Sequence, residues 1–174
     1  KSVIHNKLKI SKGNYALITL HRPSNVDDEN TFSGIMEALE TIGKDISIVF
    51  PAHPRTSKMI NEFGFDSRIK QIPNFVVTEP LGYLDFLALM KHAKVVLTDS
   101  GGLQEETTAL GIPCITIREN TERPITVEQG TNTVVGNSTE NIVKEWKNIV
   151  NTGGKKGRIP EMWDGKTAER IGKA

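Results

Sequence analysis

The sequence predicts an α/β fold of the Rossmann-like class, in which helices cover both faces of a parallel sheet. Short apolar runs alternate with longer amphipathic segments, as strands alternate with helical crossovers. The run at residues 95–98 passes through a Gly-Gly pair directly into a helix-like segment, a turn common in such folds. With 174 residues, the chain can bury about two-thirds of its unfolded surface. We therefore expect one main domain.

Six short apolar runs are the expected strands. They contain few charged residues, which is typical of strands buried on both faces of a parallel sheet. They lie at residues 15–20, 46–50, 75–77, 95–98, 114–117 and 133–135.

The segments between these runs carry apolar residues at helical spacing. The expected helices hold Phe32, Ile35, Met36, Leu39 and Ile42; Leu84, Leu87, Leu89 and Met90; and Ile142, Val143, Trp146 and Ile149. Residues 137–140 resemble a capping box before the last of these. Residues 1–152 are thus predicted to form a Rossmann-like domain. Residues 153–174 are predicted to be a flexible basic link and a short helix from about Lys166.

Composition limits the classes of partner and compartment. The formal net charge of +1 gives no electrostatic reason to expect nucleic acid or a membrane as partner. Cys114, the single cysteine, lies in an apolar run, where a small buried residue is expected rather than a nucleophile. The scattered His residues and the isolated Asp99 predict no metal site. We expect a cytoplasmic protein, and a fragment of a longer polypeptide because position 1 is Lys.

Polar clusters follow five of the expected strands. They are His21-Arg22, His53-Pro54-Arg55, Glu79-Pro80, Asp99-Ser100-Gly101-Gly102 and the segment at residues 118–123. Because ligands of parallel α/β sheets bind at the carboxyl ends of the strands, these clusters are expected to form one site. Their Arg, His and Gly-Gly content favours a phosphorylated ligand.

The Gly-Gly turn is the most informative cluster. Gly101 and Gly102 allow backbone to approach a ligand closely, and the N-terminus of the following helix attracts phosphate. Glu106, one helical turn later, could accept ribose hydroxyls. The alternative is an ordinary strand-to-helix turn with Ser100 as N-cap. Neither a Walker loop nor the dinucleotide fingerprint is present.

Each other candidate also has a structural alternative. His21 could be satisfied by a loop carbonyl with Arg22 at the surface, and His53 and Arg55 could belong to a turn over the sheet edge. Arg123 could reach a phosphate, or pair with Glu122 or Glu119. Phe86 and Tyr83 could face a nucleobase, or simply belong to the core.

Four segments, in this order, closely resemble the non-hydrolysing UDP-N-acetylglucosamine 2-epimerases. They are Thr19-Leu20-His21-Arg22, Pro51-Ala52-His53, Asp99-Ser100-Gly101-Gly102-Leu103-Gln104-Glu105-Glu106 and Arg118-Glu119-Asn120-Thr121-Glu122-Arg123-Pro124. The likeness covers essentially the whole chain. It implies the C-terminal half of a glycosyltransferase-B-type two-domain fold, with the active site between the halves.

The resemblance also implies roles for the matched residues. His21 would be catalytic, contacting the diphosphate as it leaves, and Arg22 would lie beside it. Ser100, Gly101, Gly102 and Arg123 would hold the UDP phosphates, Glu106 the ribose and Phe86 the uracil; His53 and Arg55 would be nucleotide or regulatory contacts. UDP would leave UDP-GlcNAc and add back to give UDP-ManNAc. No cofactor is implied.

Two departures from the family pattern accompany this likeness. Pro23-Ser24 stands where the family often has Arg-Glu, and Arg55-Thr56 where many members have Asn-Pro, so we do not expect the family's allosteric regulation to transfer. The carboxylates that handle the C2 proton belong to the N-terminal domain, the expected partner within the polypeptide. A homodimer of the full-length enzyme is also expected. The alternatives are a glycosyltransferase donor domain, an epimerase for a modified UDP-GlcNAc relative, and a non-catalytic sugar-nucleotide sensor.

Overall fold

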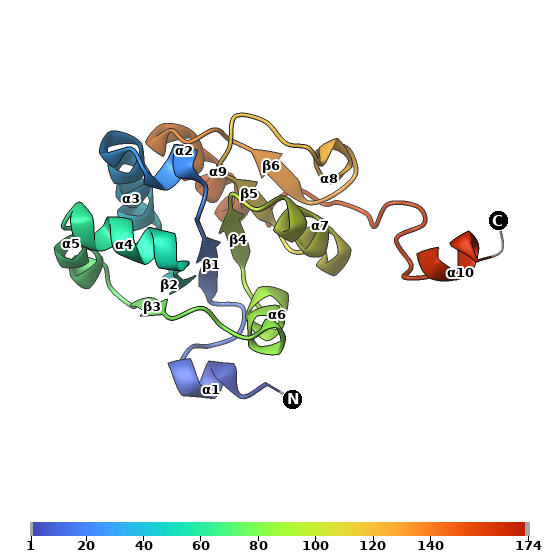
Figure 1. The fold of residues 1–174 in the computed structure, drawn as a ribbon, viewed down its shortest axis with the longest axis horizontal. Coiled ribbons are helices and arrows are strands. Elements are labelled where there is room, and N and C mark those ends of the chain that lie inside the picture. Colours follow the sequence, from blue (N-terminus) through green and yellow to red (C-terminus); the bar gives the residue numbers. More distant parts are fainter. Residues whose placement is uncertain (1, 173–174) are drawn as a thin grey trace.

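The computed structural model describes residues 2–172 and contains a six-stranded sheet in the order β3-β2-β1-β4-β5-β6 (Figure 1). All neighbouring strands run parallel, with β1 between β2 and β4. This is the doubly wound Rossmann order, so the predicted fold class is confirmed. The strands are β1 Tyr15–Thr19, β2 Ser47–Pro51, β3 Phe75–Thr78, β4 Val95–Thr98, β5 Cys114–Thr116 and β6 Asn132–Val134.

Successive residues of each central strand pack on opposite faces of the sheet. Ala16 and Ile18 of β1 belong to one apolar cluster, while Tyr15 and Leu17 belong to another. All four are fully buried. Burial on both faces explains why β1, β2 and β4 are continuous apolar runs without alternation.

The larger cluster is covered by four helices, α3 Glu29–Gly43, α4 Pro54–Glu62, α5 Asp66–Gln71 and α9 Thr139–Thr152. Asp28 caps α3 by accepting from the Thr31 N–H. Ser138 caps α9, accepting from the Asn141 N–H. The expected capping box with Glu140 is therefore wrong, because the helix begins one residue later than that motif requires.

The opposite face is covered by α1 Ile4–Leu8, α6 Tyr83–Lys91 and α7 Gly101–Leu110. Tyr15 donates a hydrogen bond of 2.5 Å to the Leu89 carbonyl and so fastens β1 to α6. Two one-turn helices, α2 Pro23–Val26 and α8 Pro124–Glu128, follow β1 and β5. Both start at a proline, which suits the first helical position.

The C-terminal segment leaves α9 through Gly153, which has the left-handed C-cap conformation. Residues 155–158 then lie against the turn after α8, where the Arg158 N–H donates to the Gln129 carbonyl at 2.7 Å. α10 Thr167–Ile171 follows; none of its residues is buried, and it stands apart from the body (Figure 1). Residues 1 and 173–174 lie outside the described residues, so the end of the expected C-terminal segment is not described.

The sequence did not predict α1, α2, α4 or α5. In α4 only Thr56 and Ile60 are buried, so its apolar face is too narrow to give a helical pattern. Between residues 2 and 172 no helix has the length and apolar character that a membrane crossing needs.

Candidate functional site

The candidate site lies where the strand order reverses, between β1 and β4. The two strands are in register, with Thr19 opposite Thr98, so both end at the same height. Their loops therefore lie side by side, and one carries His21 and Arg22 while the other carries Asp99 and Ser100. In doubly wound folds this crevice is the usual ligand site.

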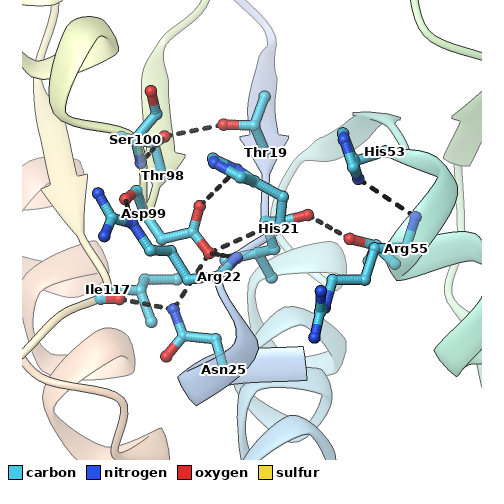
Figure 2. Close-up of polar contacts among 12 residues, drawn as sticks. Thr19, His21, Arg22, Asn25, His53, Arg55, Thr98, Asp99, Ser100 and Ile117 are labelled. Atoms are coloured by element: carbon cyan, nitrogen blue, oxygen red, sulfur yellow. Dashed lines mark hydrogen bonds and ion pairs between the residues drawn. The ribbon is translucent and has the colours of Figure 1, made fainter. Parts of the chain in front are cut away.

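Asp99 is fully buried and joins the two loops (Figure 2). Its Oδ2 accepts from the backbone N–H groups of His21 at 2.9 Å and Arg22 at 2.8 Å. The side chain of buried Asn25 also reaches this oxygen, at 3.3 Å, and donates to the Ile117 carbonyl at 2.8 Å. The two loops are thus held together by a carboxylate with several donors around it.

His21 and Asp99 form an ion pair when His21 is protonated. His21 Nδ1 lies 2.9 Å from Asp99 Oδ1. The hydrogen bond to Asp99 raises the pKa of His21, against the opposing effects of burial and of the Arg22 charge. Burial raises the pKa of Asp99, but the hydrogen bonds from His21 and Arg22 outweigh it, and the net shift is downward. The pair therefore presents an imidazole that carries charge over a wider pH range than a free histidine.

The N-terminus of α7 has the features expected of a phosphate-binding turn. Ser100 occupies the N-cap position with extended backbone, yet its side chain makes no capping bond. A Cβ at Gly101 or Gly102 would meet nothing within 4 Å, and neither glycine has positive φ. The described chain therefore gives no steric reason for glycine at these positions, where it weakens a helix. A turn with a purely structural role would not explain why glycine occupies positions 101 and 102.

A pocket of 230 Å³ opens at this edge of the sheet. It brings together four of the predicted site residues, His21, His53, Phe86 and Ser100. The rings of His21 and His53 are 5.7 Å apart. His53 Nδ1 accepts from the Arg55 N–H at 3.2 Å, so its Nε2 remains available as a donor (Figure 2).

Arg55 turns to a protein partner rather than to the pocket. Its guanidinium forms a bidentate pair with Asp27, with Nε 2.8 Å from Oδ1. The pair connects the start of α4 to the end of α2. Arg55 lowers the pKa of Asp27. Because both groups are largely exposed, we assign the pair little stability of its own.

Arg123 lies at the N-cap of α8, outside the lining of that pocket. Its Nε is 3.0 Å from Glu105 Oε1, and both side chains are exposed. Glu122 instead pairs with Arg118, which lowers the pKa of Glu122 to about 2. Arg123 therefore pairs with Glu105 of α7, and not with Glu122 or Glu119 as the sequence suggested. The chain turns at residues 118–122 and so brings Arg123 close to α7.

A buried polar network fixes the segment that carries Arg123. Gln104 Oε1 accepts from Thr121 at 2.5 Å and from Asn132 at 3.1 Å. Asn132 also donates to Thr126 of α8 at 3.0 Å. This network connects α7, β6 and α8, so Arg123 is held in position relative to Ser100 and the glycines.

Glu106 points its Oε2 into a buried position without a hydrogen-bond partner. Burial raises its pKa. An unpartnered carboxylate oxygen is costly to bury, and the protonated form favoured by the raised pKa lowers that cost.

Two residues that shape the site, Asp99 and Asn25, were not given this role from the sequence. The sequence does contain a signal for Asp99, because an acidic residue directly follows a buried strand. An unpaired charge there would destabilise the fold, so Asp99 needs partners. Within residues 2–172, no cluster of three or more His, Cys, Asp or Glu side chains is placed to hold a metal ion.

The whole chain matches a known family. The model of the UDP-N-acetylglucosamine 2-epimerase family matches residues 1–174. A UDP-N-acetylglucosamine 2-epimerase of Methanocaldococcus jannaschii is 44% identical over 161 residues, covering 90% of this chain and 43% of its own length. A UDP-2,3-diacetamido-2,3-dideoxy-D-glucuronate 2-epimerase of Pseudomonas aeruginosa is 38% identical over 135 residues, covering 77% of this chain and 36% of its own.

Solved structures agree with this match. The crystal structure of the M. jannaschii UDP-GlcNAc 2-epimerase in complex with UDP-GlcNAc and UDP superposes with a TM-score of 0.87. It is 39% identical and covers 99% of this chain and 48% of that one. The chain thus spans less than half the length of these relatives. Because the family model matches all 174 residues, the chain belongs to the UDP-N-acetylglucosamine 2-epimerase family.

Proposed function

We propose that this chain is the UDP-binding half of a longer enzyme that interconverts UDP-GlcNAc and UDP-ManNAc. The observation that carries the proposal is the N-terminus of α7, where Ser100 is uncapped and Gly101 and Gly102 leave open space. Family membership and the relative solved with UDP-GlcNAc and UDP support the choice of nucleotide. In this proposal residues 1–152 are the nucleotide-binding domain and residues 153–174 a connecting segment.

The proposed reaction is an elimination followed by an addition. A base removes the proton from C2 of the sugar, the C1–O bond breaks, and UDP leaves with the bonding electron pair, so that a C1=C2 double bond forms. UDP then adds back at C1 while a proton reaches the opposite face of C2. Because charge develops on the diphosphate, groups that stabilise it lower the barrier.

The residues of this chain would act on the diphosphate and the nucleoside. Charged His21 and neighbouring Arg22 would meet the developing negative charge, and the N–H groups at the start of α7 would hold a phosphate. Arg123 would add a second cation. As the family resemblance implies, Glu106 would accept the ribose hydroxyls and Phe86 would lie against the uracil.

The test is calorimetric titration of the chain with UDP in the presence of EDTA. Binding should persist, because the proposed site uses Arg side chains and a helix N-terminus rather than a metal. Ser100→Ala should weaken it roughly tenfold or more, the effect of losing a hydrogen bond to a charged group. Ser11→Ala, an exposed serine before β1, is the matched control and should bind normally. No binding by the unaltered chain, or abolition by EDTA, would overturn the proposal.

The same site geometry would serve a glycosyltransferase that binds a UDP-sugar donor. Incubating the longer protein with UDP-GlcNAc and no acceptor separates the two activities, since only an epimerase changes the configuration at C2. The P. aeruginosa relative, named for a modified UDP-sugar, supports testing that sugar in parallel.

We further propose that the longer protein works in the cytoplasm. The support is Cys114, which is buried and unpaired, as is usual where thiols stay reduced. The homodimer expected from the family resemblance stays a prediction, and light scattering on the longer protein checks it.

A further inference from the structure

Asp99 is the most completely buried charge of the site, and its role goes beyond joining two loops. Removing a carboxylate from water is energetically costly unless its partners compensate. Asp99 Oδ2 accepts from the backbone N–H groups of His21 and Arg22 and from the side-chain amide of Asn25. The uncharged amide oxygen of an asparagine at position 99 could accept the same hydrogen bonds. The structural role at Oδ2 therefore does not require a charge.

Oδ1 is where the charge matters, because its neighbour is His21 Nδ1 at 2.9 Å. In the neutral imidazole, a carboxylate oxygen at this distance favours the proton on Nδ1, because an unprotonated nitrogen would place its lone pair against that oxygen. This tautomer leaves Nε2 as the nitrogen available to the pocket that His21 lines. An asparagine side chain at this position could keep its carbonyl oxygen in the place of Oδ2 and donate from its NH₂ group to Nδ1. It would then favour the Nε2–H tautomer of His21 and would remove the negative charge beside the ring.

The other groups around His21 oppose its protonation or leave it unsupported. Arg22, the next residue, lowers the pKa of His21. From the second strand end, His53 lies with its ring 5.7 Å away and is a donor at Nε2 rather than an anion. Within residues 2–172, Asp99 is the one acidic side chain paired with His21, so the charge on the imidazole depends on it.

We propose that Asp99 is a positioning residue of the diphosphate site, which holds His21 with Nε2 toward the ligand and places a negative charge beside its Nδ1. The inference rests on the proposed function for the identity of the ligand. The position and charge state of His21 in the free chain do not depend on that identity.

The first test uses the unaltered chain without ligand. Nitrogen-15 chemical shifts of the four histidines, assigned with His21→Gln, report the protonated nitrogen of each ring across pH. We expect His21 to be the Nδ1–H tautomer above its midpoint, whereas exposed imidazoles generally favour Nε2–H. An Nε2–H tautomer at His21 would overturn the inference, and this measurement holds even if variants of Asp99 fail to fold.

The second test compares Asp99→Asn with Asn25→Ala. Asn25→Ala removes one donor to Oδ2 but leaves the charge beside His21. We expect Asp99→Asn to lower the pH midpoint of His21 and Asn25→Ala to leave it nearly unchanged. Equal shifts in the two variants would mean that Asp99 acts only through loop structure, and would overturn the inference.

UDP titrations then separate this inference from the proposed function. If the unaltered chain binds UDP, Asp99→Asn should bind roughly tenfold more weakly at neutral pH, with the difference shrinking at low pH, where both imidazoles are charged. Equal binding by the two proteins at every pH would overturn the positioning role alone. Failure of the unaltered chain to bind UDP would overturn the proposed function instead. The tautomer of His21, measured without ligand, would still test the role of Asp99.

Discussion

At the residue scale, the protonation of His21 makes the site sensitive to pH. Its pKa is raised above the ordinary 6.5 by Asp99, so its contribution to folding stability is complete below pH 6.5 and lost as pH rises through the raised pKa. The same sign applies to an anionic ligand, because the ring is a cation only below that pKa.

We therefore expect UDP affinity to fall as pH rises through the midpoint of His21, measured by calorimetry at several pH values. His21→Gln is the control, because the pH dependence that remains in it belongs to the nucleotide, whose phosphate ionises near pH 6. Identical profiles for the two proteins would contradict the prediction.

Arg123 gives a second prediction at this scale. Arg123→Ala should weaken UDP binding by roughly 1.5–3 kcal/mol, the range for a charge-assisted hydrogen bond. The melting temperature should change little, since the pair with Glu105 is exposed. Glu105→Gln is the matched control, which removes the same ion pair but keeps the cation, and should retain affinity. A large loss of melting temperature with normal affinity would identify Arg123 as structural.

At the scale of elements, the first turn of α7 has two requirements that conflict. Helix stability favours alanine over glycine there, whereas close approach of a ligand to the backbone favours glycine. Alanine at Gly101 or Gly102 meets no obstacle in the chain and improves helix propensity. We expect each alanine variant to stabilise the free chain by up to about 0.5–1 kcal/mol in urea unfolding, and to weaken UDP binding. Gly130→Ala is the contrast, because a Cβ there would collide with Thr108 and Thr126. Stabilisation without loss of affinity would contradict a ligand approaching these glycines.

The six strands were predictable from the sequence, whereas α1, α2, α4 and α5 were not. The expected strand at residues 95–98 has the observed bounds, and the other five strands begin and end within one residue of those expected. Local composition defines such strands because their side chains are mainly apolar or β-branched and none is charged. α1 and α5 were missed because five or six residues are too few to show a period.

The candidate site was predictable as a location but not as a set of contacts. Its position at the strand ends follows from the parallel topology alone. The pairing of Arg55 with Asp27, 28 residues apart, depends on how α2 and α4 meet, and no local pattern reports it. The partner of Arg123 is likewise fixed by the turn at residues 118–122.

At the scale of the whole molecule, the division of labour between the two halves of a longer enzyme can be tested with this chain alone. His21, Arg22 and Ser100 are suited to the diphosphate, and Glu106 is the nearby carboxylate proposed for the ribose. We expect no enzyme-like exchange of the C2 proton of UDP-GlcNAc in heavy water, followed by NMR, since abstraction needs a base within hydrogen-bond reach. Rapid exchange would place a base in this chain.

The contact between the C-terminal segment and the turn after α8 limits which residue can occupy position 157. Gly157 lies so close to the backbone of Gly130 that no side chain fits between them, and Lys155 hydrogen-bonds the Val127 carbonyl in the same stretch. A side chain at position 157 would push residues 155–158 away from the turn that follows α8 and would break the hydrogen bond from the Arg158 N–H to the Gln129 carbonyl.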